Sequence, residues 1–401
     1  MGWRRGQDSV TRSGPRIVIA GGGVIGSATA YYLAREGVSA TVVEPDPTYE
    51  FAATPRAVGG VRFQHGLADN VRMSQFGAKV YSDFGRHVQG SPVDFDPGYR
   101  RVGYLFMVQG AAATASLQAC VEMQRGLNVE VELLDRAELE RRFPSFDFSR
   151  AEVAAYSAAD AQIDPNAALQ GYRRAAQALG AQYLQDRVVG IDVDTKGSRV
   201  RGVQLQLGPR LDADIVLNAT NCWAAEVCAM VGMPLPVAPM RRQQFFFKAQ
   251  ETIEPIPVMR ELSGFALRPE RDGYLVAVTR FKEPRGFNWN LEHELFESEL
   301  WPALVERSPR FEAIRLQHGW VGHYDMCELD GNPIIGEFEG GVKGFFVAAG
   351  FSGHGLQHAP AVGRGLAECF VHGRYQSLDL SAFSYGRVRE QRPLIDQGPK
   401  A

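Results

Sequence analysis

The chain has 401 residues, of which 45% are hydrophobic and 22% are charged, and its formal net charge is −3. This composition is typical of a water-soluble enzyme, and the length is sufficient for two domains with large cores. No region is basic enough to indicate a nucleic-acid partner. No apolar run reaches the roughly 18 residues that a membrane-spanning helix needs.

The N-terminal tail and the cysteines bear on localisation. Residues 1–15 contain three arginines but no apolar stretch, so we expect a disordered tail rather than a signal peptide; a mitochondrial transit peptide here would have to be unusually short. The five cysteines are an odd number and include no Cys-x-x-Cys pair. We therefore expect neither a disulfide framework nor a metal site, and we expect a reducing, cytoplasmic environment.

The segment from Arg16 to Glu44 is the most informative part of the sequence. It predicts a short apolar strand, a glycine turn, a helix and a second apolar strand that ends in an acid. Gly21 permits the tight turn, Gly23 lets a pyrophosphate approach the backbone, and Gly26 lets the helix pack closely on the sheet. Glu44 is placed to accept hydrogen bonds from a ribose 2′-hydroxyl. The segment therefore predicts a dinucleotide site.

The middle of the chain predicts a loop followed by helices and strands. Residues 45–63 are rich in small residues, glycine and proline and indicate a loop. Asp135 and Glu138 have the spacing of a capping box. The further expected elements are helices at 67–88, 114–127, 136–143 and 165–179, a strand at 104–109, and a β-meander at 188–193, 200–207 and 215–218, followed by a helix at 224–231.

The last third changes character twice. Alternating stretches such as 243–248 and 273–279 predict an antiparallel sheet, with a helix at about 291–305. From residue 320 onward, a buried strand at 345–349 leads into a glycine turn at 350–356. A helix follows, from near Pro360 to Gly373.

Together these elements predict a mixed α/β (α+β) fold with two interleaved domains. A Rossmann-like dinucleotide-binding domain would take residues 16–95, 150–233 and 320–390. A substrate domain with a mixed or antiparallel sheet would take residues 96–149 and 234–319.

The second glycine turn distinguishes between dinucleotides. NAD and FAD share the first fingerprint, but a second strand–glycine–helix unit can hold the far end of an extended cofactor. The N-terminus of its helix would face the flavin pyrimidine ring, where negative charge accumulates on reduction.

At this point the sequence resembles the D-amino-acid oxidase/sarcosine oxidase (DAO) family of FAD enzymes, and most closely its sarcosine oxidase and dimethylglycine dehydrogenase side. The resemblance spans residues 16–390. The matching blocks are residues 21–44, 57–62, 215–223, 330–336 and 350–356.

The resemblance implies bound FAD, a substrate-domain sheet over the flavin, and oxidation of a C–N bond in an amino acid or N-alkyl amino acid. A hydride equivalent would pass to flavin N5, and the imine would then hydrolyse. By position, Val188 resembles a residue that contacts adenine, and Ala219 and Thr220 resemble the turn near the pyrophosphate. The expected cofactor-binding residues are Gly21, Gly23, Val24, Ile25, Gly26, Glu44, Arg56, Ala57, Gly59, Gly60, Val188, Ala219, Thr220, Trp223, Gly350, Phe351, Ser352, Gly353, His354, Gly355 and Leu356.

Arg62 is the expected anchor for a substrate carboxylate, because a guanidinium fork suits a carboxylate and the family places an arginine there. Arg56 and Arg241 are weaker candidates for this anchor, and Gln64 and Gln357 are expected near the substrate. His354, in the second glycine turn, is expected to face the flavin and tune the substrate amine. The catalytic set is completed by Tyr274, which would line the pocket or belong to the core.

Three departures from the family pattern qualify these expectations. Gln357 stands where sarcosine oxidases carry a lysine, and residues 264–279 contain no lysine, so neither sarcosine nor oxygen is indicated as the reactant. His323 stands where the covalent-flavin cysteine would be, with Cys327 four residues on. We therefore expect noncovalent FAD.

Two alternatives stay open. A 2-hydroxy-acid dehydrogenase of similar fold would share the carboxylate anchor. A flavin-binding assembly or partner subunit would need no small substrate. A partner subunit or a homo-oligomer is compatible with either.

Overall fold

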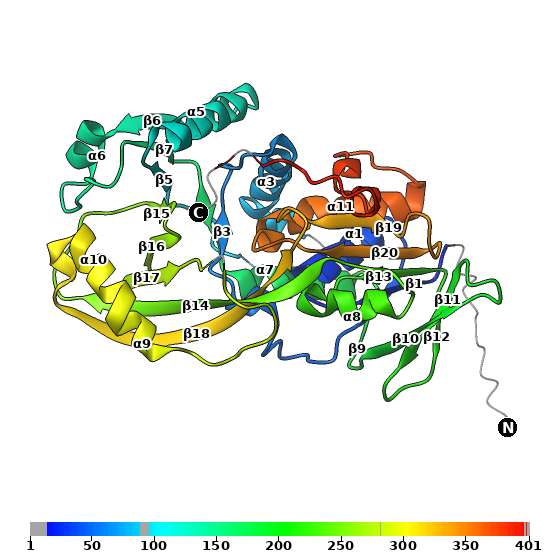
Figure 1. Cartoon of the computed structure of the whole chain (residues 1–401). Coiled ribbons are helices and arrows are strands. Elements are labelled where there is room, and N and C mark those ends of the chain that lie inside the picture. The colour runs from blue at the N-terminus through cyan, green and yellow to red at the C-terminus, as the bar shows by residue number, and fades with distance from the viewer. Residues whose placement is uncertain (1–13, 89–95, 281, 397, 399–401) are drawn as a thin grey trace.

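The computed structural model describes residues 14–88, 96–280, 282–396 and 398 (Figure 1). Of the expected N-terminal tail, residues 1–13 lie outside the described residues. Two large sheets dominate the described part, a six-stranded sheet and an eight-stranded sheet, with helices between and around them. The predicted mixed α/β fold is confirmed.

The six-stranded sheet is parallel apart from one edge strand. Its order is β19-β20-β13-β1-β2-β9, and only β19 runs antiparallel to its neighbour. Apolar runs buried on both faces suit central parallel strands. Its strands are β1 (Ile17–Ala20), β2 (Ala40–Val43), β9 (Gln182–Leu184), β13 (Ile215–Asn218), β19 (Ile334–Glu337) and β20 (Phe345–Ala349).

Helices cover one face of this sheet, and a small antiparallel sheet with a short helix covers the other. Ile17 and Ile19 of β1 pack with the helices, whereas Val18 and Ala20 pack on the opposite side. The helices are α1 (Val24–Arg35), α3 (Ala68–Tyr81), α4 (Phe84–His87), α7 (Pro165–Ala178) and α11 (Gly355–His372). The other side holds β10 (Val188–Val193), β11 (Val200–Leu205), β12 (Leu211–Asp212) and α8 (Ala224–Ala229).

The eight-stranded sheet is mixed. Its order is β18-β14-β17-β16-β15-β5-β7-β6, antiparallel throughout except for the parallel pair β15 and β5. One face packs on α9 (His293–Leu295), a π-helical turn at Phe296–Leu300 and α10 (Trp301–Arg307). Its strands are β5 (Tyr104–Val108), β6 (Glu132–Asp135), β7 (Val153–Ser157), β14 (Val237–Ala249), β15 (Val258–Glu261), β16 (Phe265–Glu270), β17 (Gly273–Val278) and β18 (Ile314–Cys327).

Short elements complete the fold. Asp135 caps α6, and its side chain accepts a hydrogen bond from the Glu138 backbone N–H, as the capping box predicts. These elements are α2 (Ala53–Arg56), α5 (Ala111–Gly126), α6 (Arg136–Arg142), α12 (Gly386–Arg389), the sheet β3 (Gly60–Val61), β8 (Ala161–Gln162) and β4 (Arg100–Arg101), and 3₁₀ turns at Asn221–Trp223, Pro309–Phe311 and Ser381–Phe383.

Several predicted elements are placed differently. The third strand of the β-meander is β12, whereas residues 215–218 form a central strand of the parallel sheet, because this apolar run is buried between β1 and β20. The predicted helix at 67–88 is interrupted between α3 and α4. The predicted loop at 45–63 contains α2 and β3.

Helix α11 begins at Gly355, ahead of the start predicted near Pro360. A proline inside a helix has no N–H to donate to the carbonyl four residues earlier. Here that carbonyl belongs to Leu356, and it accepts a hydrogen bond of 2.7 Å from the Tyr81 hydroxyl instead. The helix therefore runs through Pro360, and its N-terminus lies at the glycine turn.

The eight-stranded sheet takes in residues on both sides of two predicted domain boundaries. It includes β7, which follows residue 150, and the whole of β18, which crosses residue 320. Segments assigned to both proposed domains therefore belong to one sheet, and the two domains are interleaved more closely than the predicted boundaries suggest.

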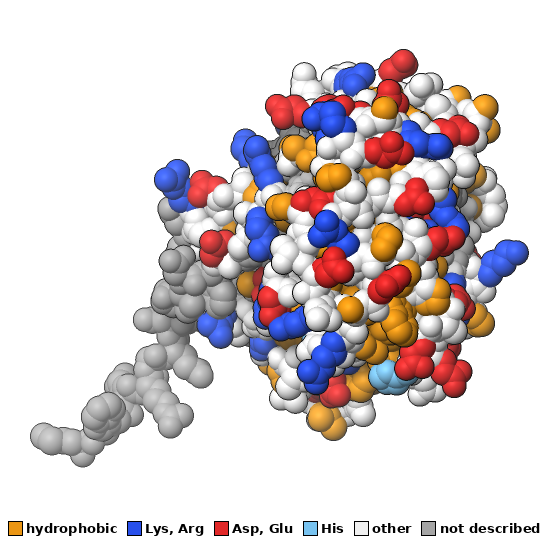
Figure 2. Space-filling view, turned by 90° about the vertical axis from the view of Figure 1, so that its left-hand side faces the viewer, with side chains coloured by type: hydrophobic (Ala, Val, Ile, Leu, Met, Phe, Trp, Pro, Cys, Tyr) orange, Lys and Arg blue, Asp and Glu red, His pale blue; other side chains and the backbone are white. Residues whose placement is uncertain are grey.

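The surface is charged and mixed. On the face seen in Figure 2, acidic and basic side chains lie interspersed, with hydrophobic side chains among them. Among the described residues, no helix combines the length and apolar character needed to cross a membrane.

Candidate cofactor and substrate site

A cavity of about 1200 Å³ lies between the two large sheets. It exceeds the usual volume of a drug-sized pocket, roughly 300–1000 Å³. Both glycine turns open into it, together with one face of the eight-stranded sheet and the last described residues of the chain. The expected site residues on its wall are Gly21, Gly23, Val24, Ile25, Glu44, Arg56, Ala57, Gly59, Gly60, Arg62, Gln64, Val188, Ala219, Thr220, Trp223, Phe351, Ser352, Gly353, His354, Gly355, Leu356 and Gln357.

The first glycine turn forms a cradle at the N-terminus of α1. Gly21 has φ +97°, and a Cβ atom there would lie 2.5 Å from the carbonyl oxygen of Ala219. A Cβ on Gly26 would collide with the carbonyl oxygen of Gly21, so Gly26 serves packing and does not line the cavity. A Cβ atom on Gly23 would meet only the Thr54 hydroxyl, at 3.9 Å. Since the first turn of α1 contains no acid, its N–H groups suit a pyrophosphate.

Glu44 is fixed at the end of β2. Its carboxylate accepts hydrogen bonds from the backbone N–H groups of Gly22 (2.8 Å) and Asp46 (3.0 Å). Burial raises the pKa of Glu44, and these two hydrogen bonds oppose the rise. The side chain lines the cavity at the position that the fingerprint assigns to a ribose.

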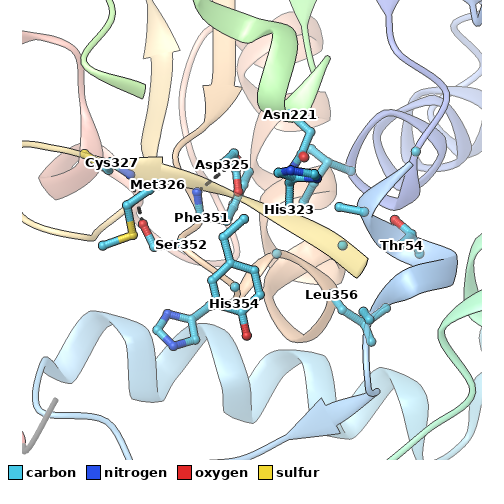
Figure 3. Close-up of a pocket in the computed structure, with 18 of the residues that line it drawn as sticks. Thr54, Asn221, His323, Asp325, Met326, Cys327, Phe351, Ser352, His354 and Leu356 are labelled. Atoms are coloured by element: carbon cyan, nitrogen blue, oxygen red, sulfur yellow. Dashed lines mark hydrogen bonds between the residues drawn. The ribbon is translucent and has the colours of Figure 1, made fainter. Parts of the chain in front are cut away.

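The second glycine turn joins β20 to α11 and is clamped by β18. The Asp325 carboxylate accepts hydrogen bonds from the N–H groups of Gly350 (2.7 Å) and Phe351 (3.1 Å), and the Ser352 hydroxyl accepts one from the Cys327 N–H (3.0 Å) (Figure 3). Burial raises the pKa of Asp325 to about 6, which these hydrogen bonds counteract. Gly350 itself does not line the cavity, and its N–H group is used in the hydrogen bond to Asp325.

Gly353 must be glycine for two reasons. Its φ is +95°, and a Cβ atom there would lie 2.6 Å from the ring of Tyr324. The turn therefore brings Tyr324 of β18 against the start of α11. The first turn of α11 contains no acid, so its N-terminus is suited to negative charge.

Arg62 lines the cavity next to the second glycine turn. Its guanidinium donates to His354 Nε2 (2.9 Å), to the carbonyl of Gln64 and to His65 Nδ1 (3.4 Å), and lies 5.2 Å from the ring centre of Phe106. No described carboxylate forms an ion pair with it. Burial and nearby Arg260 lower the pKa of Arg62 to about 10, so it stays charged at neutral pH. A half-buried guanidinium without a described carboxylate partner is suited to bind an anion.

Three histidines surround this arginine. The His65 ring lies 5.2 Å from that of His354 and 5.5 Å from that of His358, and Ser74 links His65 to His358 by hydrogen bonds of 2.9 and 3.2 Å. Burial and the charge of Arg62 lower the pKa of all three, that of His358 to about 3. All three imidazoles are therefore neutral at pH 7. Arg62 forms no ion pair with a described carboxylate, and the neutral histidines add no positive charge to the site.

The two glutamines near Arg62 are engaged by the protein. Gln357 accepts a hydrogen bond from the Arg62 backbone N–H (2.9 Å) and contacts His65 Nε2 (3.2 Å). The amide of Gln64 donates to the carbonyl of Tyr104 and to Asp160. Both therefore position Arg62 and its surroundings, although they line the cavity.

Three residues expected in the site have partners that do not fit their predicted roles. Tyr274 lies on the far side of the eight-stranded sheet, where it stacks on Phe247, so its position is that of a core residue. Arg241 does not line the cavity, because its guanidinium pairs with Glu283 and Glu292. Arg56 lines the cavity, but its guanidinium donates to the carbonyls of Glu50 and Val321.

Other cavity residues were not predicted from the sequence. Arg242, Arg260 and Tyr324 come from three different strands of one sheet, and Asp325 follows Tyr324. The sequence gives one indication of these residues. Side chains alternate along a strand, so one of the adjacent Arg241 and Arg242 in β14 must face each side of the sheet. The sequence does not say which.

The cavity wall has unused polar atoms that fit a large polar ligand. Buried polar groups seldom lack hydrogen bonds. The atoms on the wall with no hydrogen-bond partner among the described residues include the Tyr49 hydroxyl, Gln64 Oε1, Gln124 Oε1, Asn221 Oδ1, His323 Nδ1 and His354 Nδ1. They extend from the Glu44 end to the Arg62 end, so the site fits an extended dinucleotide together with a small substrate. Among the described residues, no group of three or more His, Cys, Asp or Glu side chains is arranged to hold a metal ion.

Comparison with known proteins agrees with this geometry. Residues 16–369 match the family model described as FAD dependent oxidoreductase (DAO). The chain belongs to this family. The predicted resemblance is thereby confirmed, and with it an FAD-dependent enzyme whose two glycine turns open into one cavity.

Members of the family align with most of the chain. FAD-dependent oxidoreductase domain-containing protein 1 of Xenopus laevis is 30% identical over 95% of this chain and 84% of its own length. Mitochondrial dimethylglycine dehydrogenase of Mus musculus is 25% identical over 96% of this chain and 46% of its own length. The crystal structure of L-proline dehydrogenase from P. horikoshii superimposes with a TM-score of 0.84, at 25% identity, over 95% of this chain and 99% of that one.

Proposed function

We propose that this enzyme oxidises the C–N bond of an amino acid or N-alkyl amino acid. The observation that carries the proposal is Arg62, a half-buried guanidinium on the cavity wall whose described hydrogen-bond partners are all uncharged. A substrate carboxylate would complete its coordination. The relatives named dimethylglycine dehydrogenase and L-proline dehydrogenase support an amine next to that carboxylate.

His354 would favour the reactive form of the amine. Because Arg62 donates to Nε2, the neutral imidazole carries its proton on Nδ1, an assignment that follows from the hydrogen-bond pattern. Nδ1 has no described partner. An N–H donor accepts no proton from an ammonium group, but it can hydrogen-bond the lone pair of a neutral amine. His354 would thus hold the substrate deprotonated at nitrogen.

The protein supplies orientation and electrostatics for the reaction. FAD, when bound, supplies the two-electron acceptor that takes a hydride equivalent at N5 from the carbon next to nitrogen. Arg62 would hold the substrate carboxylate, and His354 would hold its amine. With both groups held, the C–H bond of the carbon between them would point in one defined direction. The imine product would then be hydrolysed.

We further propose that the flavin is noncovalent. His323, at the position of the family's linking cysteine, accepts a hydrogen bond from the Asn288 backbone N–H (3.0 Å), and burial lowers its pKa to about 4. Burial raises the pKa of the Cys327 thiol, and its sulfur contacts Asp330. Neither group is set up as an anionic nucleophile. Acid precipitation should release all of the yellow colour into the supernatant.

The proposed reaction is tested by anaerobic titration of the holoenzyme. Amino acids and N-methyl amino acids should bleach the visible flavin band, whereas 2-hydroxy acids with the same side chains should not. Bleaching by the hydroxy acids alone would replace the proposal with a C–O dehydrogenase. No bleaching by either panel, with copurification of another chain, would favour a partner subunit. Cytoplasmic localisation stays a prediction.

A further inference from the structure

Arg62 is not the only arginine at the substrate end of the cavity. Arg242 of β14 and Arg260 of β15 line the same cavity. Alternate residues of β14 face it, since Met240, Arg242 and Gln244 line the cavity while Arg241 turns to the acids on the other side.

The described partners of Arg242 are uncharged. Its guanidinium donates to the Thr279 hydroxyl (2.7 Å) and lies 4.7 Å from the ring centre of Tyr324. No described carboxylate lies within ion-pair distance of it. Glu283, the acid whose charge reaches it, is already paired with Arg241.

Tyr324 connects this second cation to the first. Its ring lies between Arg242 and the glycine turn at Gly353, next to His354, which receives the hydrogen bond of Arg62. Burial raises the pKa of its phenol, but Arg242, Arg260 and Arg62 outweigh burial and lower it below 10 overall. A buried phenol with a lowered pKa reports a positive potential at this end of the cavity.

Two nearby acids offset this positive charge only in part, because neither forms an ion pair with Arg62 or Arg242 among the described residues. Asp160 accepts hydrogen bonds from the Phe63 N–H and from Gln64, and burial raises its pKa to about 7. Asp396, near the C-terminus, is the other acid whose charge reaches Arg62. One substrate carboxylate on Arg62 would still leave the guanidinium of Arg242 on the cavity wall with no described carboxylate within ion-pair distance.

We infer that the substrate end of the cavity holds two carboxylates, one on Arg62 and one on Arg242 with Arg260. This inference rests on the proposed function and names its substrate class: dicarboxylic amino acids, with the second carboxylate on the side chain or on the nitrogen substituent. Arginine forks match planar carboxylates, and the half-buried guanidinium of Arg242 has no described carboxylate within ion-pair distance, so it is suited to bind one.

Binding of unreactive acids to the holoenzyme tests the inference without relying on turnover. Calorimetry should show that the best of malonate, succinate and glutarate binds roughly tenfold or more tightly than the monocarboxylate of equal carbon number. Arg242→Gln or Arg260→Gln should abolish this preference and leave monocarboxylate binding little changed. The matched control is Arg315→Gln, an exposed arginine on β18, which should keep the preference.

Equal affinity for mono- and dicarboxylates in the unmodified enzyme overturns the inference, whether or not the variants fold. A dicarboxylate preference that survives both Arg242→Gln and Arg260→Gln overturns it as well. Failure of the proposed function is distinct: no amine would then reduce the flavin, although the dicarboxylate preference would still be measurable. Conversely, equal reduction by monocarboxylic and dicarboxylic amino acids, with no binding preference, defeats this inference alone.

Discussion

Replacing Arg62 with glutamine tests the centre of the proposed site. The substitution removes the guanidinium, whose side-chain contacts are His354, His65, the Gln64 carbonyl and the Phe106 ring. The backbone N–H, which donates to Gln357, remains. A bidentate carboxylate contact consists of two charge-assisted hydrogen bonds, each contributing roughly 1.5–3 kcal/mol. Losing at least about 3 kcal/mol corresponds to at least about a hundredfold weaker substrate binding.

The assay is anaerobic flavin reduction as a function of substrate concentration. Arg62→Gln should raise the half-saturating concentration by at least about a hundredfold, while the flavin content of the purified protein stays that of the unmodified enzyme. Arg315→Gln serves as the control for loss of one arginine. An unchanged half-saturating concentration in Arg62→Gln would refute the anchor role, and loss of flavin instead would assign Arg62 to the cofactor.

Three further predictions concern the cofactor cradle and the buried acids. Glu44→Gln should weaken FAD binding by about tenfold, because an ionised acceptor binds a hydroxyl donor more strongly than an amide, and flavin-fluorescence titration of the apoprotein checks this. Gly353→Ala should lower the free energy of unfolding by about 1–3 kcal/mol, because residue 353 has a positive φ and a Cβ atom there would meet the Tyr324 ring. The control is Gly126→Ala, at the end of α5, where a Cβ atom would meet no neighbour and the free energy should not fall. Equal melting temperatures of the two variants would contradict this prediction. The raised pKa of Asp160, about 7 against 3.8, means that its contribution to stability is full below pH 3.8 and is lost as the pH rises to about 7, so Asp160→Asn should flatten the pH dependence of unfolding in that window.

Local sequence was sufficient for the nucleotide cradle. Gly21, Gly23, Gly26 and Glu44 lie within one strand–helix–strand unit, where spacing alone fixes the geometry. In the structure Gly21, Gly23 and Glu44 line the cavity and Gly26 packs against Gly21, while their role in holding the nucleotide stays a prediction. The second glycine turn was likewise readable, because a strand, a glycine run and a helix follow one another directly. Its helix starts earlier than the sequence suggested, because a distant hydroxyl, that of Tyr81, satisfies the carbonyl that Pro360 leaves without a donor.

The sequence determined where the glycine turns lie, which acid follows the second strand, and which family these segments resemble, since each depends on neighbours a few residues apart. The tertiary structure alone decided which polar side chains meet in the cavity. It turned Arg242 inward and Arg241 outward, surrounded Arg62 with three histidines from two separate segments, and used Asp325 of β18 to clamp a turn at the end of β20. These contacts depend on how strands from remote parts of the chain pair and twist, so a side chain's facing and charge environment are properties of the packed sheets and are absent from the local pattern.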